Sequence, residues 1–358
     1  MANPIDMTYE PKSREEEFLS CHLKNIKAGE TGPEYVQWLC SHKCNFRCAH
    51  CGTGAAEATP GEMTTKEALK MVDDLADMGT KLLSVTGGEP IIRDDIFEVL
   101  GHAKDRGIRV GFVTNGYAVR EKKDQIAKLE PESVLVSIDG YRENHDRIRG
   151  VPNAYKRAID ALDVFADIGV GMRGVSMVFL ESNEKDIPNI VDEALEHGVK
   201  KLRIQAVVPE GRAKEMENKE EEIYRLMKLI LELRSQGKPV EACEGLGYLG
   251  PLEEKLRNYP FLCGCGYTTF TINEVGLVQG CPAIDFPGLN EGNIRERNMR
   301  DIWLNSFERF RTTLYQDLPQ KCQDCEYLNR CRGGCWLHRV NGEFCYMDIA
   351  KRVAEEML

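Results

Sequence analysis

Short apolar runs alternate with longer segments of helical periodicity along most of the chain. The apolar runs, which we expect to form strands, lie at residues 35–40, 82–86, 110–114, 133–138, 175–180 and 202–208. The amphipathic segments that follow them lie at residues 64–79, 94–104, 120–129, 155–168, 187–197 and 215–234. Nearly continuous apolar strands separated by helices are typical of a buried parallel sheet. Right-handed crossovers would curl such a sheet into a barrel or a partial barrel, so we predict an α/β fold.

The segments at the edges of this repeat are more polar. Residues 1–34 are charged and weakly periodic, and we interpret them as an arm with one short helix at residues 14–27. Thr64 precedes Glu67 by three residues, which predicts a capping box at the start of a helix. Residues 215–234 are acidic with apolar residues on one side, so we expect a solvated outer helix that closes the last unit.

Polar and glycine-rich loops follow several of the predicted strands. In a parallel sheet, the loops that leave the carboxyl ends of the strands gather on one side, where ligands bind. These loops contain residues 44–51, Gly87-Gly88-Glu89, Asn115-Gly116 and Asp139-Gly140. We therefore expect them to form one ligand site.

Charge and length exclude several classes of partner. The 358 residues suffice for one large and one smaller domain. Acidic residues outnumber basic ones by 58 to 47, which gives a net charge of -11, so we expect neither nucleic acid nor a membrane surface as partner. Residues 1–17 contain no apolar signal core, and no run in the chain approaches about 18 apolar residues, so we predict a cytoplasmic protein.

Fourteen cysteines in a chain without an export signal are more often metal ligands than disulfides. Cys44, Cys48 and Cys51 follow the first predicted strand with the spacing C-x3-C-x2-C. A [4Fe–4S] cluster is normally held by four thiolates, so three ligands on one loop would leave one iron open to a small molecule. The alternative is a zinc knuckle, for which Cys40 or His50 could supply a fourth ligand.

A second and denser group of cysteines occupies the C-terminal part of the chain. Its members are Cys263, Cys265, Cys281, Cys322, Cys325, Cys331, Cys335 and Cys345. Four of them could form a structural zinc ribbon, but the whole group has enough thiols for two four-coordinate clusters. Cys21 and Cys243 stand apart, and for each we expect a small apolar side chain that is at least partly buried.

The C-x3-C-x2-C loop, together with Gly87-Gly88-Glu89 after the second strand, resembles the radical S-adenosylmethionine (SAM) superfamily. The resemblance spans about residues 35–234 and implies a partial (β/α)6 TIM-like barrel. It implies that Cys44, Cys48 and Cys51 hold a [4Fe–4S] cluster with an open iron site, which the amine and carboxylate of SAM chelate. Reductive cleavage of SAM would then give a 5′-deoxyadenosyl radical that abstracts hydrogen from a substrate.

The same resemblance assigns further residues to SAM. They are Gly87, Gly88 and Glu89 at the amine, Ser137 and Asp139 at the ribose and carboxylate, Arg149 at the carboxylate, His50 near the adenine, and Asn115 in a Thr-Asn-Gly turn after the third strand. An arginine suits a carboxylate because its donors form a fixed fork. The alternatives are turns and helix caps, and for His50 a surface histidine beside a metal loop.

The C-terminal cysteines resemble the SPASM extension of radical SAM enzymes, which implies two auxiliary [4Fe–4S] clusters. One would be bound by Cys322, Cys325, Cys331 and Cys345, and the other by Cys263, Cys265, Cys281 and Cys335, with Cys243 as a substitute for one of these. We expect an N-terminal arm at residues 1–34, the radical SAM partial barrel at 35–240, and a linker with a small cysteine-rich iron–sulfur domain at 241–358.

SPASM proteins mostly mature peptides and proteins, which implies a peptide or small-molecule substrate, most simply a ribosomal peptide that is oxidised or cross-linked. Pro282 stands where anaerobic sulfatase maturases have an acidic residue, which disfavours that branch. The 34 residues before the first strand are too few for a leader-binding domain, so a leader peptide, if one is used, would need the arm or a separate leader-binding protein. We expect an electron donor such as flavodoxin or ferredoxin. The alternatives are oxidative decarboxylation of a tetrapyrrole side chain in haem biosynthesis or, in other classes, an electron-transfer iron–sulfur protein or a zinc scaffold.

Overall fold

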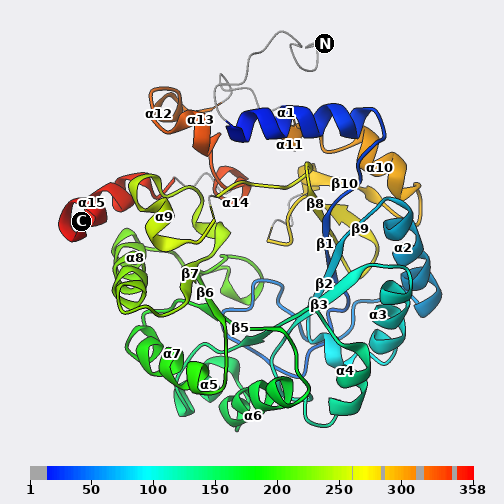
Figure 1. Ribbon diagram of the computed structural model, residues 1–358, viewed down its shortest axis with the longest axis horizontal. Helices are drawn as coiled ribbons and strands as arrows, with labels where there is room; N and C mark the ends of the chain where they lie inside the picture. The colour runs from blue at the N-terminus through cyan, green and yellow to red at the C-terminus, as the bar shows by residue number, and fades with distance from the viewer. Residues whose placement is uncertain (1–13, 260, 284–286, 312–317, 341–344) are drawn as a thin grey trace.

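One sheet of ten strands runs through the computed structural model, which describes residues 14–259, 261–283, 287–311, 318–340 and 345–358. The strands are β1 (Tyr35–Leu39), β2 (Leu82–Thr86), β3 (Arg109–Thr114), β4 (Ser133–Ser137), β5 (Met172–Val178), β6 (Lys201–Gln205), β7 (Val240–Ala242), β8 (Thr269–Ile272), β9 (Leu277–Gln279) and β10 (Asn290–Asn293). Their order in the sheet is β10-β9-β8-β1-β2-β3-β4-β5-β6-β7. Figure 1 shows helices arranged as a ring outside the strands.

The strands from β1 to β7 are all parallel, and each pairs with the next along the chain. In the register of β1 and β2, for example, Val36 lies opposite Leu83 and Trp38 opposite Val85. The six predicted strands are confirmed, with ends that differ from the prediction by at most three residues, and β7 is an additional strand. The predicted α/β partial barrel is confirmed, since β7 and β10 stand at the two ends of the strand order.

The C-terminal region adds strands to the same sheet. β8 pairs with β1 in parallel, and β9 and β10 follow by antiparallel pairing. The predicted domain boundary after residue 240 falls within β7, and the division into an arm, a barrel and a C-terminal domain stays a prediction. Both regions therefore contribute to one continuous sheet.

Helices follow most of the parallel strands, and the C-terminal region adds further helices (Figure 1). In the first part of the chain they are α1 (Arg14–Lys27), α2 (Thr65–Asp77), α3 (Ile96–Asp105), α4 (Lys123–Leu129), α5 (Glu143–Arg149), α6 (Ala154–Asp167), α7 (Ile187–Glu196) and α8 (Glu220–Ser235). The C-terminal region contributes α9 (Glu253–Leu256), α10 (Met299–Asn305), α11 (Glu308–Arg311), α12 (Gln320–Gln323), α13 (Leu328–Cys331), α14 (Trp336–Val340) and α15 (Met347–Met357). The predicted helix at residues 14–27 and the capping box of Thr64 and Glu67 are confirmed.

Three helices of the barrel begin two or more residues later than the sequence predicted, namely α3 at Ile96, α4 at Lys123 and α8 at Glu220. The side chain of Asn218 exchanges two hydrogen bonds with the backbone of Val207, at 3.0 and 2.8 Å, and these bonds hold the residues before α8 in a loop. α5 forms within a segment for which the sequence predicted no helix.

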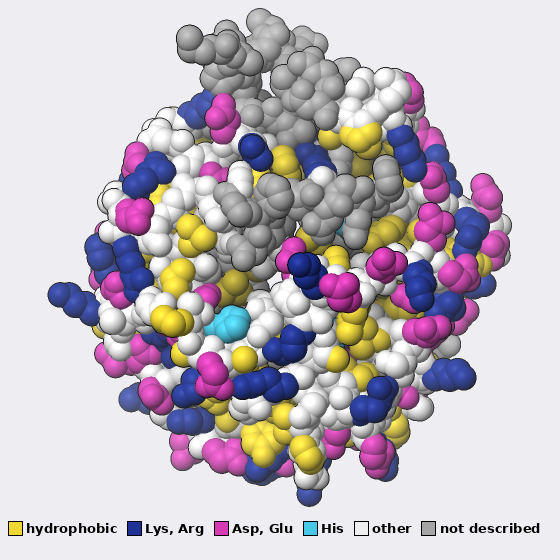
Figure 2. Space-filling model, turned by 180° about the vertical axis from the view of Figure 1, so that it is seen from behind, with side chains coloured by type: hydrophobic (Ala, Val, Ile, Leu, Met, Phe, Trp, Pro, Cys, Tyr) yellow, Lys and Arg dark blue, Asp and Glu magenta, His cyan; other side chains and the backbone are white. Residues whose placement is uncertain are grey.

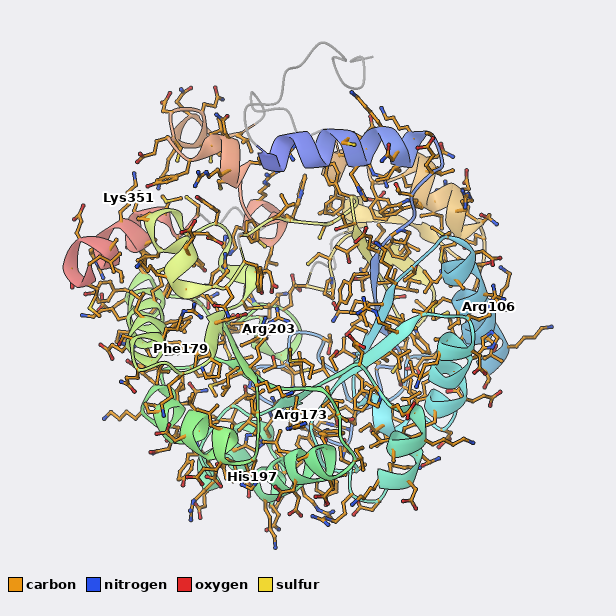
Figure 3. All side chains as sticks on the ribbon, in the orientation of Figure 1. Arg106, Arg173, Phe179, His197, Arg203 and Lys351 are labelled. Atoms are coloured by element: carbon orange, nitrogen blue, oxygen red, sulfur yellow. The ribbon has the colours of Figure 1, made fainter. Side chains whose placement is uncertain are left out.

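Alternate residues of the barrel strands face different surroundings. In β6, Leu202 and Ile204 are buried, whereas Arg203 and Gln205 are only half-buried. Side chains of a strand point alternately to its two faces, so one face packs on the helices while the other borders the interior of the barrel. Arg203 accordingly lies inside the ring of helices, whereas Arg106 lies at its periphery (Figure 3). The same alternation in β1, β2 and β4 leaves a partly polar inner wall.

The last helix, α15, lies along the outer helix α8 (Figure 1). Arg352 Nη2 lies 3.1 Å from Glu221 Oε2, and the guanidinium stacks 3.9 Å from the ring centroid of Tyr224. Acidic and basic side chains are interspersed around the reverse face of the molecule (Figure 2). In the described part of the chain, no helix combines the length and the apolar character that a bilayer span requires.

A buried ion pair ties β7 to the segment that leads to the first C-terminal cysteines. Arg257 Nη1 lies 2.8 Å from Glu253 Oε1, and the two side chains are 0% and 4% exposed. Arg257 also donates to the carbonyl oxygens of Ala242 and Cys243, and Glu253 accepts from the Phe261 amide. Removal of either partner would therefore leave a buried charge without compensation.

We predict that Arg257→Met lowers the free energy of unfolding by about 3–5 kcal/mol, because the Glu253 carboxylate would stay buried without its cation. The matched change Arg297→Met removes the exposed partner of Asp301 and should cost about 0–1 kcal/mol. Urea unfolding followed by circular dichroism measures both losses. Equal losses for the two variants would contradict the importance given to the buried pair.

Candidate active site

All residues that the sequence assigned to the first cluster and to SAM border one cavity. The cavity has a volume of about 220 Å³ and lies where β1 to β6 end. From the predicted set it is lined by Cys44, Cys48, His50, Cys51, Gly87, Gly88, Glu89, Asn115, Ser137, Asp139 and Arg149. They converge because the carboxyl ends of parallel strands lie on the same side of a sheet.

The three thiols lie on a segment that we call the cysteine loop (residues 40–56). Two hydrogen-bond donors, one from this loop and one from α5, point toward its sulfur atoms. The Phe46 amide donates to Cys44 Sγ at 3.4 Å, and Arg149 Nη1 lies 3.7 Å from Cys48 Sγ. Burial raises the pKa of Cys44 to about 11 and also raises that of Cys48. Both groups are therefore thiols at neutral pH unless a metal displaces the proton.

Gly87 and Gly88 bring the end of β2 against the cysteine loop. A Cβ atom on Gly88 would lie 2.0 Å from the carbonyl oxygen of Lys43, and one on Gly87 would lie 2.6 Å from that of Ser41. The Gly88 amide donates to the Ser41 carbonyl at 2.6 Å, and the Glu89 amide donates to the Lys43 carbonyl at 3.0 Å. No larger residue fits these positions without moving the loop, so close backbone packing explains both glycines.

The carboxylate of Glu89 is buried and bound by the protein itself. It accepts hydrogen bonds from the Thr114 hydroxyl and the Asn115 amide, both at 2.7 Å, and from the Ile91 amide at 3.3 Å. Burial raises the pKa of Glu89 to about 7, although these hydrogen bonds and Arg149 oppose the shift. Glu89 thus joins the ends of β2 and β3 and places on the cavity wall a carboxyl group that titrates near neutral pH.

Asp139 is fully buried between an arginine and a histidine. Its Oδ2 lies 2.5 Å from Arg149 Nη2 and 3.1 Å from His50 Nε2, and its Oδ1 accepts from the Val178 amide. Burial alone would raise its pKa, but Arg149 and His50 hold the pKa of Asp139 well below its usual range. Asp139 is therefore ionised at neutral pH, and it fixes the orientation of both partners.

Asn115 and Ser137 occupy the wall in different ways. The Asn115 side chain donates to Asn45 Oδ1 and accepts from the Tyr117 amide, both at 2.9 Å, so it joins the cysteine loop to the turn after β3. Ser137 ends β4 and lies beside Ser176, its partner in β5. Ser137 thus lines the cavity, whereas the side-chain amide of Asn115 makes hydrogen bonds within the surrounding loops.

Ten further residues line the cavity, and five of them have polar side chains that were not predicted as site residues. The five are Thr86, Thr114, Ser176 and Gln205, at or near the ends of β2, β3, β5 and β6, and Arg212 in the loop after β6. A polar residue near the carboxyl end of an apolar strand is the signal that could have found the first four. Arg212 stands in a charged segment and carries no such signal.

A larger cavity of about 500 Å³ adjoins the first and shares seven lining residues with it, among them His50, Cys51 and Gly87. Its other walls come from the loop after β6, which includes Glu210, and from the turn between β8 and β9, which includes Glu274. The larger cavity therefore has space for a second molecule beside the first site. In the described ranges, neither lysine nor arginine contributes to its wall.

The C-terminal cysteines interact electrostatically within the two sets that the sequence suggested. Hydrogen bonds between thiols and mutual electrostatic effects group Cys263, Cys265, Cys281 and Cys335. Electrostatic effects likewise group Cys322, Cys325, Cys331 and Cys345. Within the ranges that the structure describes, no three Cys, His, Asp or Glu side chains form a group that could hold a metal ion, and ligation by these sets stays a prediction.

Cys243 has a different environment from these two sets. Its Sγ lies 3.1 Å from Arg203 Nη2 and 3.2 Å from Glu244 Oε2, and Tyr259 donates to the same carboxylate at 2.7 Å. Burial raises the pKa of Cys243, which Arg203 opposes. The sequence left open whether Cys243 or Cys265 belongs with Cys263 and Cys281. Cys265 makes hydrogen bonds with both of these thiols.

Replacement of Glu89 by glutamine tests the raised pKa of this carboxyl group. The pKa rises from 4.5 to about 7 on folding, so the native state holds the proton more tightly and stability falls as the pH rises between these values. Relative to Glu89→Gln, the wild-type protein should lose on the order of 2–3 kcal/mol between about pH 4.5 and pH 8. Urea unfolding at a series of pH values measures the difference, and a constant difference would contradict the raised pKa.

Comparison with known proteins supports the predicted family. The model of the radical SAM superfamily matches residues 38–194, and the SPASM model, an iron-sulfur cluster-binding domain, matches residues 263–326. The chain is 30% identical over 322 residues to the AdoMet-dependent heme synthase of Methanosarcina barkeri, with 84% of this chain and 90% of that protein covered. It is 27% identical over 323 residues to mycofactocin maturase MftC of Mycobacterium tuberculosis, with 87% of this chain and 81% of that protein covered.

The fold has a solved counterpart in SuiB of Streptococcus suis, whose structure contains the precursor peptide SuiA. The TM-score is 0.73 at 17% identity, and the match covers 98% of this chain and 84% of SuiB. An identity this low shows the fold alone. The matches to the two models and to the heme synthase establish the family, so the chain belongs to the radical SAM superfamily and is a SAM-dependent enzyme with a SPASM iron–sulfur cluster-binding domain.

Proposed function

We propose that the enzyme holds its SAM-binding cluster on Cys44, Cys48 and Cys51 and binds SAM in the cavity of about 220 Å³ beside them. The substrate occupies the adjoining cavity of about 500 Å³. The observation that carries this proposal is the convergence of the loops after β1 to β6 on two cavities that share a wall. Cluster, SAM and substrate are then held next to one another, as a hydrogen abstraction requires.

The groups on the cavity wall suit both cofactors. Three thiols on one loop match a cluster with one open iron. Two buried nitrogen atoms, His50 Nδ1 and Arg149 Nε, have no hydrogen-bond partner among the described residues. Buried polar atoms are nearly always satisfied, so these two suit a polar ligand such as the carboxylate and adenine of SAM.

The cluster and SAM, when bound, supply the one-electron cleavage of a carbon–sulfur bond. The chain itself binds and orients them and keeps water away. Arg149, fixed by Asp139, presents its remaining donors to a carboxylate. Phe46 is buried and meets the ring of Tyr117 edge-on at 5.8 Å, and both rings pack in one apolar cluster with the three cysteines of the loop.

We also propose that the two C-terminal cysteine sets bind auxiliary clusters, with Cys265 rather than Cys243 in the first set. The thiol contacts of Cys265 and the pairing of Cys243 with Arg203 support this choice. An electron donor of the flavodoxin or ferredoxin type and a separate leader-binding protein stay predictions. The fate of the electron after hydrogen abstraction would depend on these auxiliary clusters.

Reduced and reconstituted protein should release 5′-deoxyadenosine when it is incubated with SAM without oxygen. The combined changes Cys44→Ala, Cys48→Ala and Cys51→Ala should abolish this release and lower the iron content from about twelve to about eight atoms per chain, since only the auxiliary sets would remain. Liquid chromatography and an iron assay measure the two effects. Release that persists in the variant, or no release from the fully loaded wild type, would refute the proposal.

We propose a peptide as the substrate, modified by oxidation or cross-linking. The wall of the larger cavity carries Glu210 and Glu274 and, in the described ranges, no lysine or arginine, which suits a neutral or cationic segment. The relationship to a maturase and the shared fold with SuiB, which was seen with a precursor peptide, also support this choice. The peptide would place one residue beside the SAM site.

A tetrapyrrole is the second candidate, because a heme synthase is among the relatives. Tetrapyrroles of haem biosynthesis carry several carboxylates. Glu210 and Glu274 would repel such groups, and the described lining of the larger cavity offers no lysine or arginine to pair with them. The charge of this wall therefore favours the peptide.

Titration of the SAM-loaded protein separates the two substrates. Iron coproporphyrin III should leave its Soret band unshifted, whereas a clear shift would favour the tetrapyrrole. The synthetic peptide Gly-Lys-Gly-Lys-Gly should bind several-fold more tightly than Gly-Glu-Gly-Glu-Gly, as measured by calorimetry, because like charges across an interface are costly. Glu210→Gln combined with Glu274→Gln should remove this preference, and a preference that survives would contradict the role of the two glutamates.

A further inference from the structure

Arg212 holds the cysteine loop from the turn that follows β6. Its Nε donates to the carbonyl oxygen of Cys48 at 2.8 Å, and its Nη1 donates to the carbonyl oxygens of Gly54 and Ala55, each at 2.9 Å. Its backbone amide donates to the Cys51 carbonyl at 3.0 Å. One residue therefore bonds four carbonyl groups of the loop that carries the three thiols.

Gly211 allows this close contact. Its φ is +55°, and a Cβ atom on it would lie 2.5 Å from both the Gly52 carbonyl oxygen and the Gly54 amide nitrogen, and 2.7 Å from the Cys51 carbonyl oxygen. The two loops consequently touch backbone to backbone, with no room for a side chain. Arg212 thus enters the cysteine loop from a fixed position.

The charge of Arg212 has no carboxylate partner among the described residues. Its guanidinium is partly buried and lines the cavity of about 220 Å³. Arg149, on the same cavity, is instead paired with Asp139 at 2.5 Å. Carbonyl groups accept from its Nε and Nη1 but carry no net charge, so the positive charge of Arg212 lies beside the backbone of Cys48 without a counterion in the described ranges. Because one-electron reduction of a cluster adds negative charge, a nearby cation without a counterion favours the reduced form.

We propose that Arg212 is a positioning residue that fixes the cysteine loop and raises the reduction potential of the cluster held there. The inference rests on the proposed function, since it needs a cluster on Cys44, Cys48 and Cys51. The segment 210–212 borders both cavities, because Arg212 lines the smaller one whereas Glu210 and Gly211 line the larger one. The loop that borders the substrate thereby also sets the electron affinity of the cluster.

Two substitutions separate the charge of Arg212 from its hydrogen bonds. Arg212→Gln removes the charge and the fork of donors, whereas Arg212→Lys keeps the charge but cannot reach all three carbonyl groups with a fork. Arg225→Gln is the control, since Arg225 lies on α8 and pairs with Glu184 at 2.9 Å. The reconstituted full-length protein is titrated by electron paramagnetic resonance, and the cluster is identified by the change that SAM causes in its signal. Iron retained in the presence of a chelator is measured in parallel.

Both Arg212 variants should lose iron from this cluster roughly tenfold faster than the control, because ligand-supporting contacts are lost. Only Arg212→Gln should show a lower midpoint potential, and a tenfold shift toward the oxidised form would equal about 59 mV. An unchanged potential in fully loaded Arg212→Gln, or an equal decrease in Arg212→Lys, would overturn the inference. A wild-type protein without any SAM-responsive cluster would instead overturn the proposed function.

Discussion

The structure of the active site depends on how a loop without helix or strand is held in place by its neighbours. The cysteine loop accepts hydrogen bonds from the ends of β2 and β3 and from the turn after β6, and it donates hydrogen bonds to the end of α5. At α5, the Arg47 amide donates to the Arg149 carbonyl at 3.4 Å and the Ala49 amide to that of Ile148 at 3.1 Å. The last carbonyl groups of a helix have no partner within the helix, so α5 and the loop satisfy each other. The position of the thiols is thus a consequence of the whole barrel.

The continuous sheet explains how the C-terminal region reaches this site. Because β8 pairs with β1, the turn between β8 and β9 comes to lie next to the cysteine loop. The Met63 amide donates to the Glu274 carbonyl at 2.7 Å, and the Thr59 hydroxyl donates to the Glu274 carboxylate at 2.9 Å. The larger cavity is therefore enclosed by both regions, and its size and charge depend on their alignment.

The sequence was sufficient for features that follow from periodicity and strand direction. The six predicted strands and the convergence of the predicted residues on one cavity follow from parallel pairing, which depends little on individual side-chain contacts. Features that depend on single contacts could not be predicted. α5 has only 7 residues and begins next to Arg142 with a φ of 50°, so it shows neither a long period nor a capping signal. The strands β8 to β10 have three or four residues each, too few for a recognisable alternation.

The same distinction applies to the assigned roles of the acidic residues. A motif locates a side chain at a site, but only the packed structure shows which of its atoms are already engaged. The Glu89 carboxylate accepts hydrogen bonds from Thr114 and Asn115, and the Asp139 carboxylate pairs with Arg149 and His50. Both acids are almost inaccessible, so their chief effect on a ligand is indirect. Glu89 holds the ends of β2 and β3 together through its hydrogen bonds. Since a fixed, desolvated charge orients its neighbours more strongly than a mobile one, the ionised Asp139 keeps Arg149 and His50 aligned before any ligand arrives.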